Sequence, residues 1–189
     1  MKNLLIGLLT ASFLSACAVA PTLPHTPRDE IRNFAVDGRF ALKITHADGQ
    51  NETSGGRLSW THENRMDRVL LANPLGIGLA EIEITPDKTR LRTGDGKTFE
   101  ADDPERLIAE VTGQPLPISH LPAWLLGRPN GDGHIERDPQ GRPLKLQEAG
   151  WHIEYAYEDD NPDTAPSRLS AFGEGMELRL RIETWKTTP

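Results

Sequence analysis

The fold of this chain is decided by an alternating stretch near its C-terminus, Met176-Glu-Leu-Arg-Leu-Arg-Ile-Glu-Thr-Trp185. Apolar and charged residues alternate there with a period of two, which is typical of a β-strand that buries one face and exposes the other. Residues 34–44 show the same alternation. Shorter strands are expected at 54–62, 68–73, 79–85, 88–93, 144–147, 151–157 and 169–171. The sequence therefore predicts a mainly β fold built of antiparallel hairpins.

Helix signals replace the strand pattern in the middle of the chain. An aspartate at 102 or 103 suits an N-cap, Pro104 suits the first helical position, and Gly113 ends the segment. A second helix fits residues 119–126, with Ser119 as its N-cap. About nine short antiparallel strands with two inserted helices indicate an open or closed β-barrel with a helical lid.

The N-terminus carries the pattern of a lipoprotein signal peptide. Its apolar run of roughly ten residues is too short to span a bilayer, which needs about 20. Small residues then precede the one cysteine of the chain, in Leu14-Ser15-Ala16-Cys17. This lipobox predicts a signal peptide at 1–16 and acylation of Cys17; the alternative is an ordinary secretory signal with a chance cysteine. Residues 17–32 are rich in proline and are expected to form a tether, and residues 33–189 a single domain.

Charge and motif content exclude several classes of protein. The net charge is −7, and acidic and basic residues are interspersed, so nucleic acid is not an expected partner. The chain contains no nucleophile elbow, phosphate-binding loop or paired-cysteine motif. The stretch at 130–133, Asn-Gly-Asp-Gly, lacks the spacing of a calcium loop. We therefore expect no enzymatic activity, no metal site and no cofactor.

The inward-facing positions of the expected strands and helices form a large apolar inventory. The candidates for the interior are Phe40, Trp60, Leu71, Ile82, Leu121, Trp124, Leu125, Trp151, Ile153, Leu178 and Leu180. A barrel interior lined in this way either packs solid or keeps a cavity that would accept acyl chains. The spacing of the residues does not choose between the two.

One turn of the expected meander is unusually apolar. Asn73-Pro74 and two glycines predict a turn, but Leu75 and Ile77 stand where polar residues are ordinary. The loop either folds back over the core or presents a hydrophobic tip to lipid or to a partner. Both interpretations are open at the level of spacing.

Several short motifs, taken in order, resemble those of a known family. They are Phe34-x-x-x-Gly38-Arg39-Phe40-Ala41, Leu71-x-Asn73-Pro74-Leu75-Gly76, Thr112-Gly113-x-Pro115-Leu116-Pro117, Leu121-x-x-Trp124-Leu125-Leu126-Gly127 and Gly150-Trp151. With Trp60 and Trp185 they extend over nearly the whole body of the chain, behind a lipobox. In this order and spacing they resemble the LolB family of outer-membrane lipoprotein receptors.

The resemblance implies an open, incomplete antiparallel β-barrel of about eleven strands, with a helical lid over a hydrophobic cavity. The strands beyond those predicted from alternation would lie at 98–101 and 131–137. It also implies a body that faces the periplasm from the outer membrane, anchored at Cys17, with Ala18 agreeing with that destination. Within the family a protruding loop with a leucine serves membrane insertion, which corresponds here to Pro74, Leu75, Gly76 and Ile77 and favours an exposed Leu75.

The resemblance further implies transfer of acylated lipoproteins from the periplasmic carrier LolA into the inner leaflet of the outer membrane. We expect the acyl chains to move down an affinity gradient, from carrier to cavity to outer-membrane phospholipid, without ATP, since about 1.4 kcal/mol is tenfold in partition. A monomer is expected. The alternative is a lipid-anchored structural or adaptor protein of the envelope with a solid barrel core.

Overall fold

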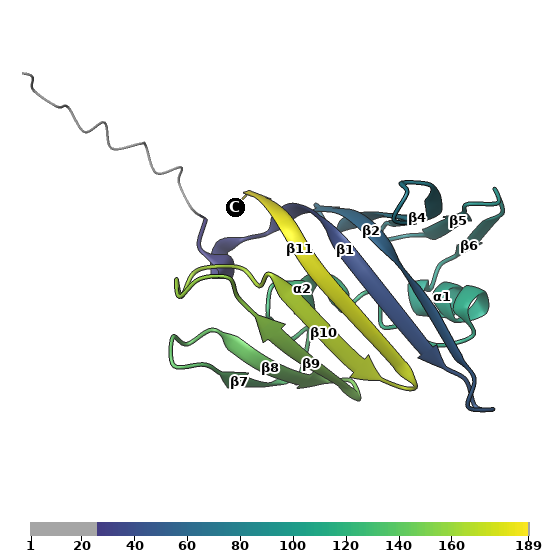
Figure 1. The fold of residues 1–189 in the computed structure, drawn as a ribbon. Coiled ribbons are helices and arrows are strands. Elements are labelled where there is room, and N and C mark those ends of the chain that lie inside the picture. The colour runs from purple at the N-terminus through teal and green to yellow at the C-terminus, as the bar shows by residue number, and fades with distance from the viewer. Residues whose placement is uncertain (1–25, 189) are drawn as a thin grey trace, which may run out of the picture.

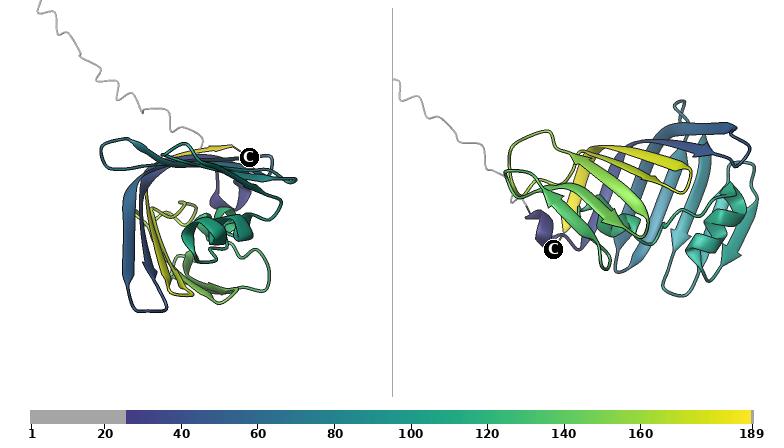
Figure 2. Two further views of the ribbon diagram at one scale, coloured as in Figure 1. Left: turned by 90° about the vertical axis from the view of Figure 1, so that its right-hand side faces the viewer. Right: turned by 90° about the horizontal axis from the view of Figure 1, so that it is seen from below.

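A computed structural model describes residues 26–188 of the chain. Its eleven strands form one antiparallel sheet, which curls around two short helices (Figure 1; Figure 2). The elements are, in chain order, η1 (Arg28–Glu30), β1 (Asn33–Thr45), β2 (Asn51–Glu63), β3 (Met66–Ala72), β4 (Gly78–Ile84), β5 (Thr89–Thr93), β6 (Thr98–Ala101), α1 (Pro104–Thr112), α2 (Leu121–Leu125), β7 (His134–Arg137), β8 (Pro143–Glu148), β9 (Trp151–Ala156), β10 (Arg168–Gly173) and β11 (Met176–Thr188).

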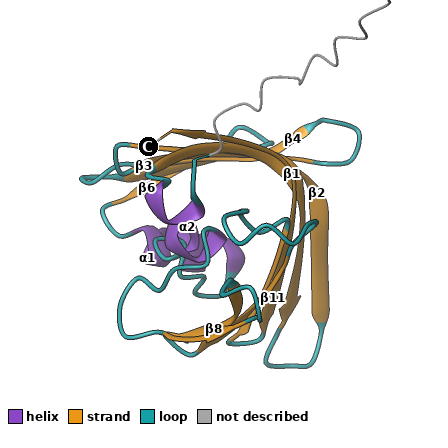
Figure 3. Ribbon diagram, turned by 90° about the vertical axis from the view of Figure 1, so that its left-hand side faces the viewer, coloured by secondary structure: helices purple, strands orange, loops and turns teal. Residues whose placement is uncertain are grey.

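The order of the strands explains why the helices form a lid. β1 and β11, the first and last strands in the chain, are paired at the middle of the sheet. The two edges of the sheet are β6 and β7, which are consecutive in the chain. The segment between them, residues 102–133, therefore passes from one edge to the other across the open side of the sheet. Figure 3 shows α1 and α2 on the concave side, and residues 102–133 are named the lid below.

Two glycines allow the strands to approach closely where the sheet bends. A Cβ atom at Gly38, in β1, would lie 2.1 Å from the carbonyl oxygen of Arg181. One at Gly56, in β2, would lie 1.9 Å from the carbonyl oxygen of Ala72. The pairing of β1 with β11 also shifts register between Asp37 and Gly38. Glycine and register shifts of this kind are the devices that give a sheet sharp curvature.

The predicted open, incomplete barrel with a helical lid is confirmed, as are the strands predicted from alternation. β6 and β7 occupy the two regions where the family resemblance required additional strands. The first helix is also as predicted. The Asp103 side chain accepts a hydrogen bond from the backbone N–H of Arg106 at 2.9 Å, and Gly113 ends the helix with φ of 74°.

The predicted start of the second helix is wrong. α2 begins at Leu121, and His120 occupies its N-cap position without a capping hydrogen bond from its side chain. Ser119 instead hydrogen-bonds to the carboxylate of Glu105 in α1, through its hydroxyl and through its backbone N–H at 3.1 Å. Ser119, which the local sequence assigned to the N-terminus of this helix, therefore hydrogen-bonds to a residue 14 positions away instead of capping the helix.

The interior is filled differently in its two halves. Around β8, β9 and α2 it is solid, with Leu146, Ile153 and Trp124 fully buried. The indole rings of Trp124 and Trp151 lie there with centroids 6.1 Å apart. In the other half, between β1 to β4, β11 and the middle of the lid, the side chains leave a cavity.

Candidate functional site

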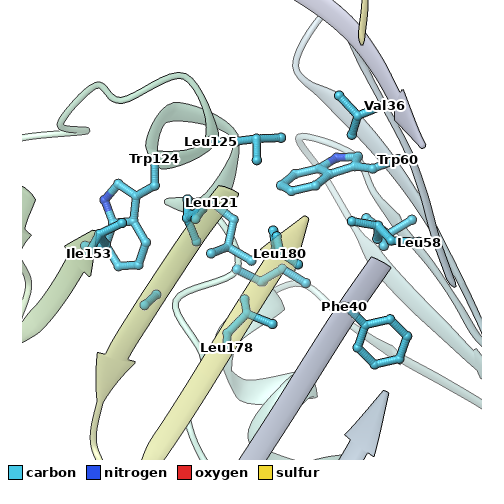
Figure 4. Packing of buried hydrophobic residues seen from close by; sticks show 14 of the residues in the cluster. Val36, Phe40, Leu58, Trp60, Leu121, Trp124, Leu125, Ile153, Leu178 and Leu180 are labelled. Atoms are coloured by element: carbon cyan, nitrogen blue, oxygen red, sulfur yellow. The ribbon is translucent and has the colours of Figure 1, made fainter. Parts of the chain in front are cut away.

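The cavity has a volume of about 90 Å³ and an entirely apolar lining. β1 to β4 and β11 form one wall, and three residues of the lid, Leu116, Ile118 and Leu121, close the other side. Figure 4 shows Leu121 of the lid together with the sheet residues Phe40, Leu58, Trp60, Leu178 and Leu180 around this region. Polar groups that would hold water are lacking among the lining residues, so the site is suited to a hydrocarbon ligand.

Most of the residues predicted for the interior are brought together around this cavity. Those that line it are Phe40, Trp60, Leu71, Ile82, Leu121, Leu178 and Leu180. The other four, Trp124, Leu125, Trp151 and Ile153, are not among the lining residues; they are buried in the solid core instead. The reason is the contact of Trp124 with Trp151, two large rings that occupy the space between lid and sheet in that half.

Six further lining residues were not predicted. They are Leu42, Leu58, Val69, Ile84, Leu116 and Ile118. Four of them are inward positions of β1, β2, β3 and β4, so strand alternation would have found them. Leu116 and Ile118 follow α1 in a segment without regular structure, where no periodic pattern marks the inward face.

A hydrogen-bonded group fixes the aromatic wall of the cavity. The indole N–H of Trp60 donates to the carboxylate of Asp67 at 2.7 Å, and Nδ1 of His62 lies 2.8 Å from the same oxygen. Asp67 is buried, with 9% of its surface exposed. The ring of Phe34 stacks on His62 and meets Trp60 edge-on, with centroids 5.2 and 5.6 Å away. The hydrogen bond to Asp67 and the contact with Phe34 therefore hold Trp60 in place where it lines the cavity.

The C-terminal half of the lid is fastened to the sheet by Glu148 of β8. The carboxylate accepts hydrogen bonds from the indole N–H of Trp124 at 2.5 Å and from the backbone N–H groups of Asn130 and Gly131 at 3.0 and 2.5 Å. Burial opposes ionisation of this carboxyl, but the hydrogen bonds outweigh it and the pKa of Glu148 lies below its ordinary value. α1, in the N-terminal half, packs against β5 and β6.

The loop between β3 and β4 does not fold back over the core. Leu75 is 86% exposed and Ile77 63% exposed. The side-chain oxygen of Asn73 accepts hydrogen bonds from the backbone N–H groups of both residues at 3.0 Å, and Gly76 supplies a φ of 86°. Figure 3 shows this loop, beside the β4 label, projecting away from the barrel. The turn is thus built by polar and glycine residues, with the large apolar side chains turned to the outside.

The sequence matches one family over nearly all of its described length. The family model named outer membrane lipoprotein LolB matches residues 32–185. The chain belongs to the LolB family.

Relatives within the LolB family cover almost the whole chain. The outer-membrane lipoprotein LolB of Dechloromonas aromatica is 56% identical over 183 residues, which is 96% of each chain. That of Bordetella petrii is 32% identical over 175 residues, 90% of this chain and 87% of its own. Among solved structures, a LolA superfamily protein from Nitrosomonas europaea matches with a TM-score of 0.43 and 10% identity, over 82% of this chain and 86% of that one.

The predicted lipid anchor lies outside the described residues, and the described residues include no membrane-spanning helix and no metal-binding group. The signal peptide and Cys17 lie outside residues 26–188. Within that range no helix has the length and apolar character needed to cross a membrane. The same range holds no group of three or more His, Cys, Asp or Glu residues placed to bind a metal ion.

Proposed function

We propose that this LolB family protein receives acylated lipoproteins from the periplasmic carrier LolA and inserts them into the inner leaflet of the outer membrane. The acyl chains of the cargo would be held in the apolar cavity, and the exposed loop at Leu75 would guide them into the bilayer. Cleavage after residue 16 and acylation of Cys17 would anchor the body, with residues 17–32 as its tether. The observation that carries the proposal is the pairing of a hydrocarbon-lined cavity with an exposed apolar loop on one domain.

The cavity must widen to hold an acyl chain. Its volume of about 90 Å³ is well below the roughly 300–1,000 Å³ of ordinary ligand sites. Only the lid offers a wall that is not part of the hydrogen-bonded sheet, since Leu116, Ile118 and Leu121 close the cavity from that side. Displacing these three side chains would enlarge the cavity on the side of the lid. Each CH₂ group that the widened cavity shields from water is worth about 0.8 kcal/mol, which would favour the filled state over exposure of the acyl chain during transfer.

The loop supplies a route from the cavity to the membrane. Leu71 lines the cavity and stands at the end of β3, directly before the loop that carries Leu75. Apolar side chains exposed on a projecting turn lose contact with water when they enter the interfacial region of a bilayer. In this arrangement the hydrocarbon of the cargo would pass from one apolar surface to the next without an external energy source.

The test is Leu75→Glu in the mature lipidated protein. Cargo uptake from the carrier should be retained, because Leu75 is outside the cavity, whereas cargo insertion into phospholipid vesicles should fall at least tenfold. Leu144→Glu is the matched control, since Leu144 is also an exposed leucine, at 41%, but lies on β8 at the other end of the sheet. The proposal fails if Leu75→Glu inserts cargo normally, or if both variants lose insertion to the same extent.

A further inference from the structure

The outer face of the sheet beside the Leu75 loop is hollowed and partly apolar. A shallow groove of about 480 Å³ is lined there by Leu70, Leu71, Ile77, Glu81 and Arg92 together with small residues of β3 to β5 and of the turn after β5. Leu70 is 44% exposed, although its strand neighbours Val69 and Leu71 face the interior. The end of β3 next to the loop thus carries apolar residues on both faces, and the exposed apolar surface continues from the loop onto the sheet.

Two arginines border this surface without a carboxylate partner. Arg92 lines the groove itself. Arg57 lies opposite Ala72 in the pairing of β2 with β3, and lines an adjoining hollow that shares Leu70 and Ala72 with the groove. Among residues 26–188, neither guanidinium forms an ion pair within 4.0 Å or a side-chain hydrogen bond.

The other arginines of the same face are committed to carboxylates. Arg68 lies 2.9 Å from Glu81 and 3.0 Å from Glu83, and Arg90 lies 2.7 Å from Glu100. Glu81 also borders the groove, so its charge is matched by Arg68 and not by Arg92. Arg92 lies across the strand pair from Glu81, and Arg57 shares its hollow with Asp37 and Glu183. In a chain with a net charge of −7, the part of this face nearest the loop therefore presents two guanidinium groups that no carboxylate of residues 26–188 holds in an ion pair.

We propose that this face is a phospholipid-binding surface, on which Arg57 and Arg92 contact lipid phosphate groups while Leu70 and Ile77 lie against the glycerol and upper acyl region. The inference rests on the proposed function and deepens it, by naming the groups that orient the loop on the bilayer. An arginine at the level of the phosphates with apolar side chains just beneath matches the layering of a bilayer interface. The apolar half of the surface is continuous with the Leu75 loop, which favours lipid over an acidic protein as the occupant.

The surface is tested with the mature lipidated chain, labelled at the loop. Because acylation uses the sulfur of Cys17, Pro74→Cys introduces a single free thiol for an environment-sensitive dye. The dye reports the ratio of inserted to free loop in vesicles of phosphatidylcholine with and without phosphatidylglycerol. With phosphatidylglycerol, Arg57→Gln and Arg92→Gln should each lower this ratio about fivefold, and the pair of substitutions on the order of 25-fold, from about 1 kcal/mol per arginine at an anionic surface.

Arg90→Gln is the matched control, because Arg90 is on the same strand and face as Arg92 but is paired with Glu100. It removes the same charge and should leave the ratio within twofold. The inference is overturned if Arg90→Gln and Arg92→Gln have equal effects, or if the Arg57 and Arg92 variants keep their loop insertion and lose only carrier binding. The Leu75→Glu variant distinguishes this inference from the proposed function. If Leu75→Glu loses loop insertion and the arginine variants keep it, only the arginine surface is rejected. If Leu75→Glu inserts its loop normally, the proposed function is rejected as well.

Discussion

Replacing leucine by phenylalanine should have opposite consequences in the two halves of the interior. Leu180 of β11 lines the cavity, whereas Leu146 of β8 is fully buried in the solid half. The close packing around Leu146 is visible at Gly133, where an added Cβ would lie 2.9 Å from the Leu146 side chain. Leu180→Phe and Leu146→Phe are therefore the same chemical change made beside empty space and beside filled space.

The magnitude follows from the volume of the cavity. At about 24 cal/mol for each Å³, an enclosed void of about 90 Å³ costs roughly 2 kcal/mol, and because this cavity is partly open that figure is an upper bound for what filling it gains. A phenylalanine at 180 fills part of it, so the free energy of unfolding should stay the same or rise by about 1 kcal/mol. A phenylalanine at 146 has no space to enter and should lower the free energy of unfolding by about 1–3 kcal/mol.

Urea unfolding of both variants and the wild type measures these differences, provided that the slope with denaturant is unchanged. Titration with a fluorescent fatty acid completes the comparison, because Leu180→Phe should weaken binding while Leu146→Phe should not. Equal destabilisation by the two substitutions would show that the region around Leu180 is packed as tightly as the rest. Unchanged fatty-acid binding by Leu180→Phe would mean that acyl chains do not enter this cavity.

Three other substitutions probe the supports of the site. Asp67→Ala should lower the free energy of unfolding by about 1–3 kcal/mol, because it leaves the buried indole N–H of Trp60 without an acceptor, and Asp67→Asn should lower it less; chemical denaturation measures both. The lowered pKa of Glu148 contributes stability that is present above pH 4.5 and is lost as the pH falls through the pKa of the folded state, so denaturation midpoints of Glu148→Gln should vary less with pH below about 4.5 than those of the wild type. Gly56→Ala should lower the thermal midpoint strongly or prevent folding, since its Cβ would meet the carbonyl oxygen of Ala72 at 1.9 Å; a midpoint within 1 °C of the wild type would contradict the close approach.

Strand alternation was sufficient for most of the sheet and insufficient at its edges. The 13-residue strands β1 and β11 repeat their pattern often enough to be recognised without further information. β6 and β7 have four residues each, with Phe99 and Ile135 as their only large apolar residues. Such short strands carry no measurable period, and they are strands because a neighbour is available to pair with them.

The sequence predicted which residues face the interior, but it did not predict which part of the interior contains the cavity. Alternation assigns a side chain to a face, but an empty volume depends on how far the opposite wall stands away. Trp60 and Trp124 illustrate the difference, since both are buried and both donate an indole hydrogen bond to a carboxylate. Only Trp60 borders the cavity, because no lid residue as large as Trp124 stands opposite it.

The lid is attached to the sheet unevenly, because its hydrogen-bonded residues and its aliphatic residues lie in different parts of it. Its C-terminal half carries Trp124 and the backbone groups bound by Glu148, and Arg128 adds a hydrogen bond of 2.9 Å to the carbonyl oxygen of Ile31 before β1. Its middle segment, residues 116–121, lines the cavity with aliphatic side chains, and the hydrogen bond of Ser119 to Glu105 joins two parts of the lid to each other instead of to the sheet. Apolar contacts of that kind are non-directional and are replaced without loss by contacts with another hydrocarbon. Residues 116–121 of the lid are therefore the part that an acyl chain could displace at the smallest free-energy cost, while Trp124 and residues 128–131 stay hydrogen-bonded to the rest of the domain.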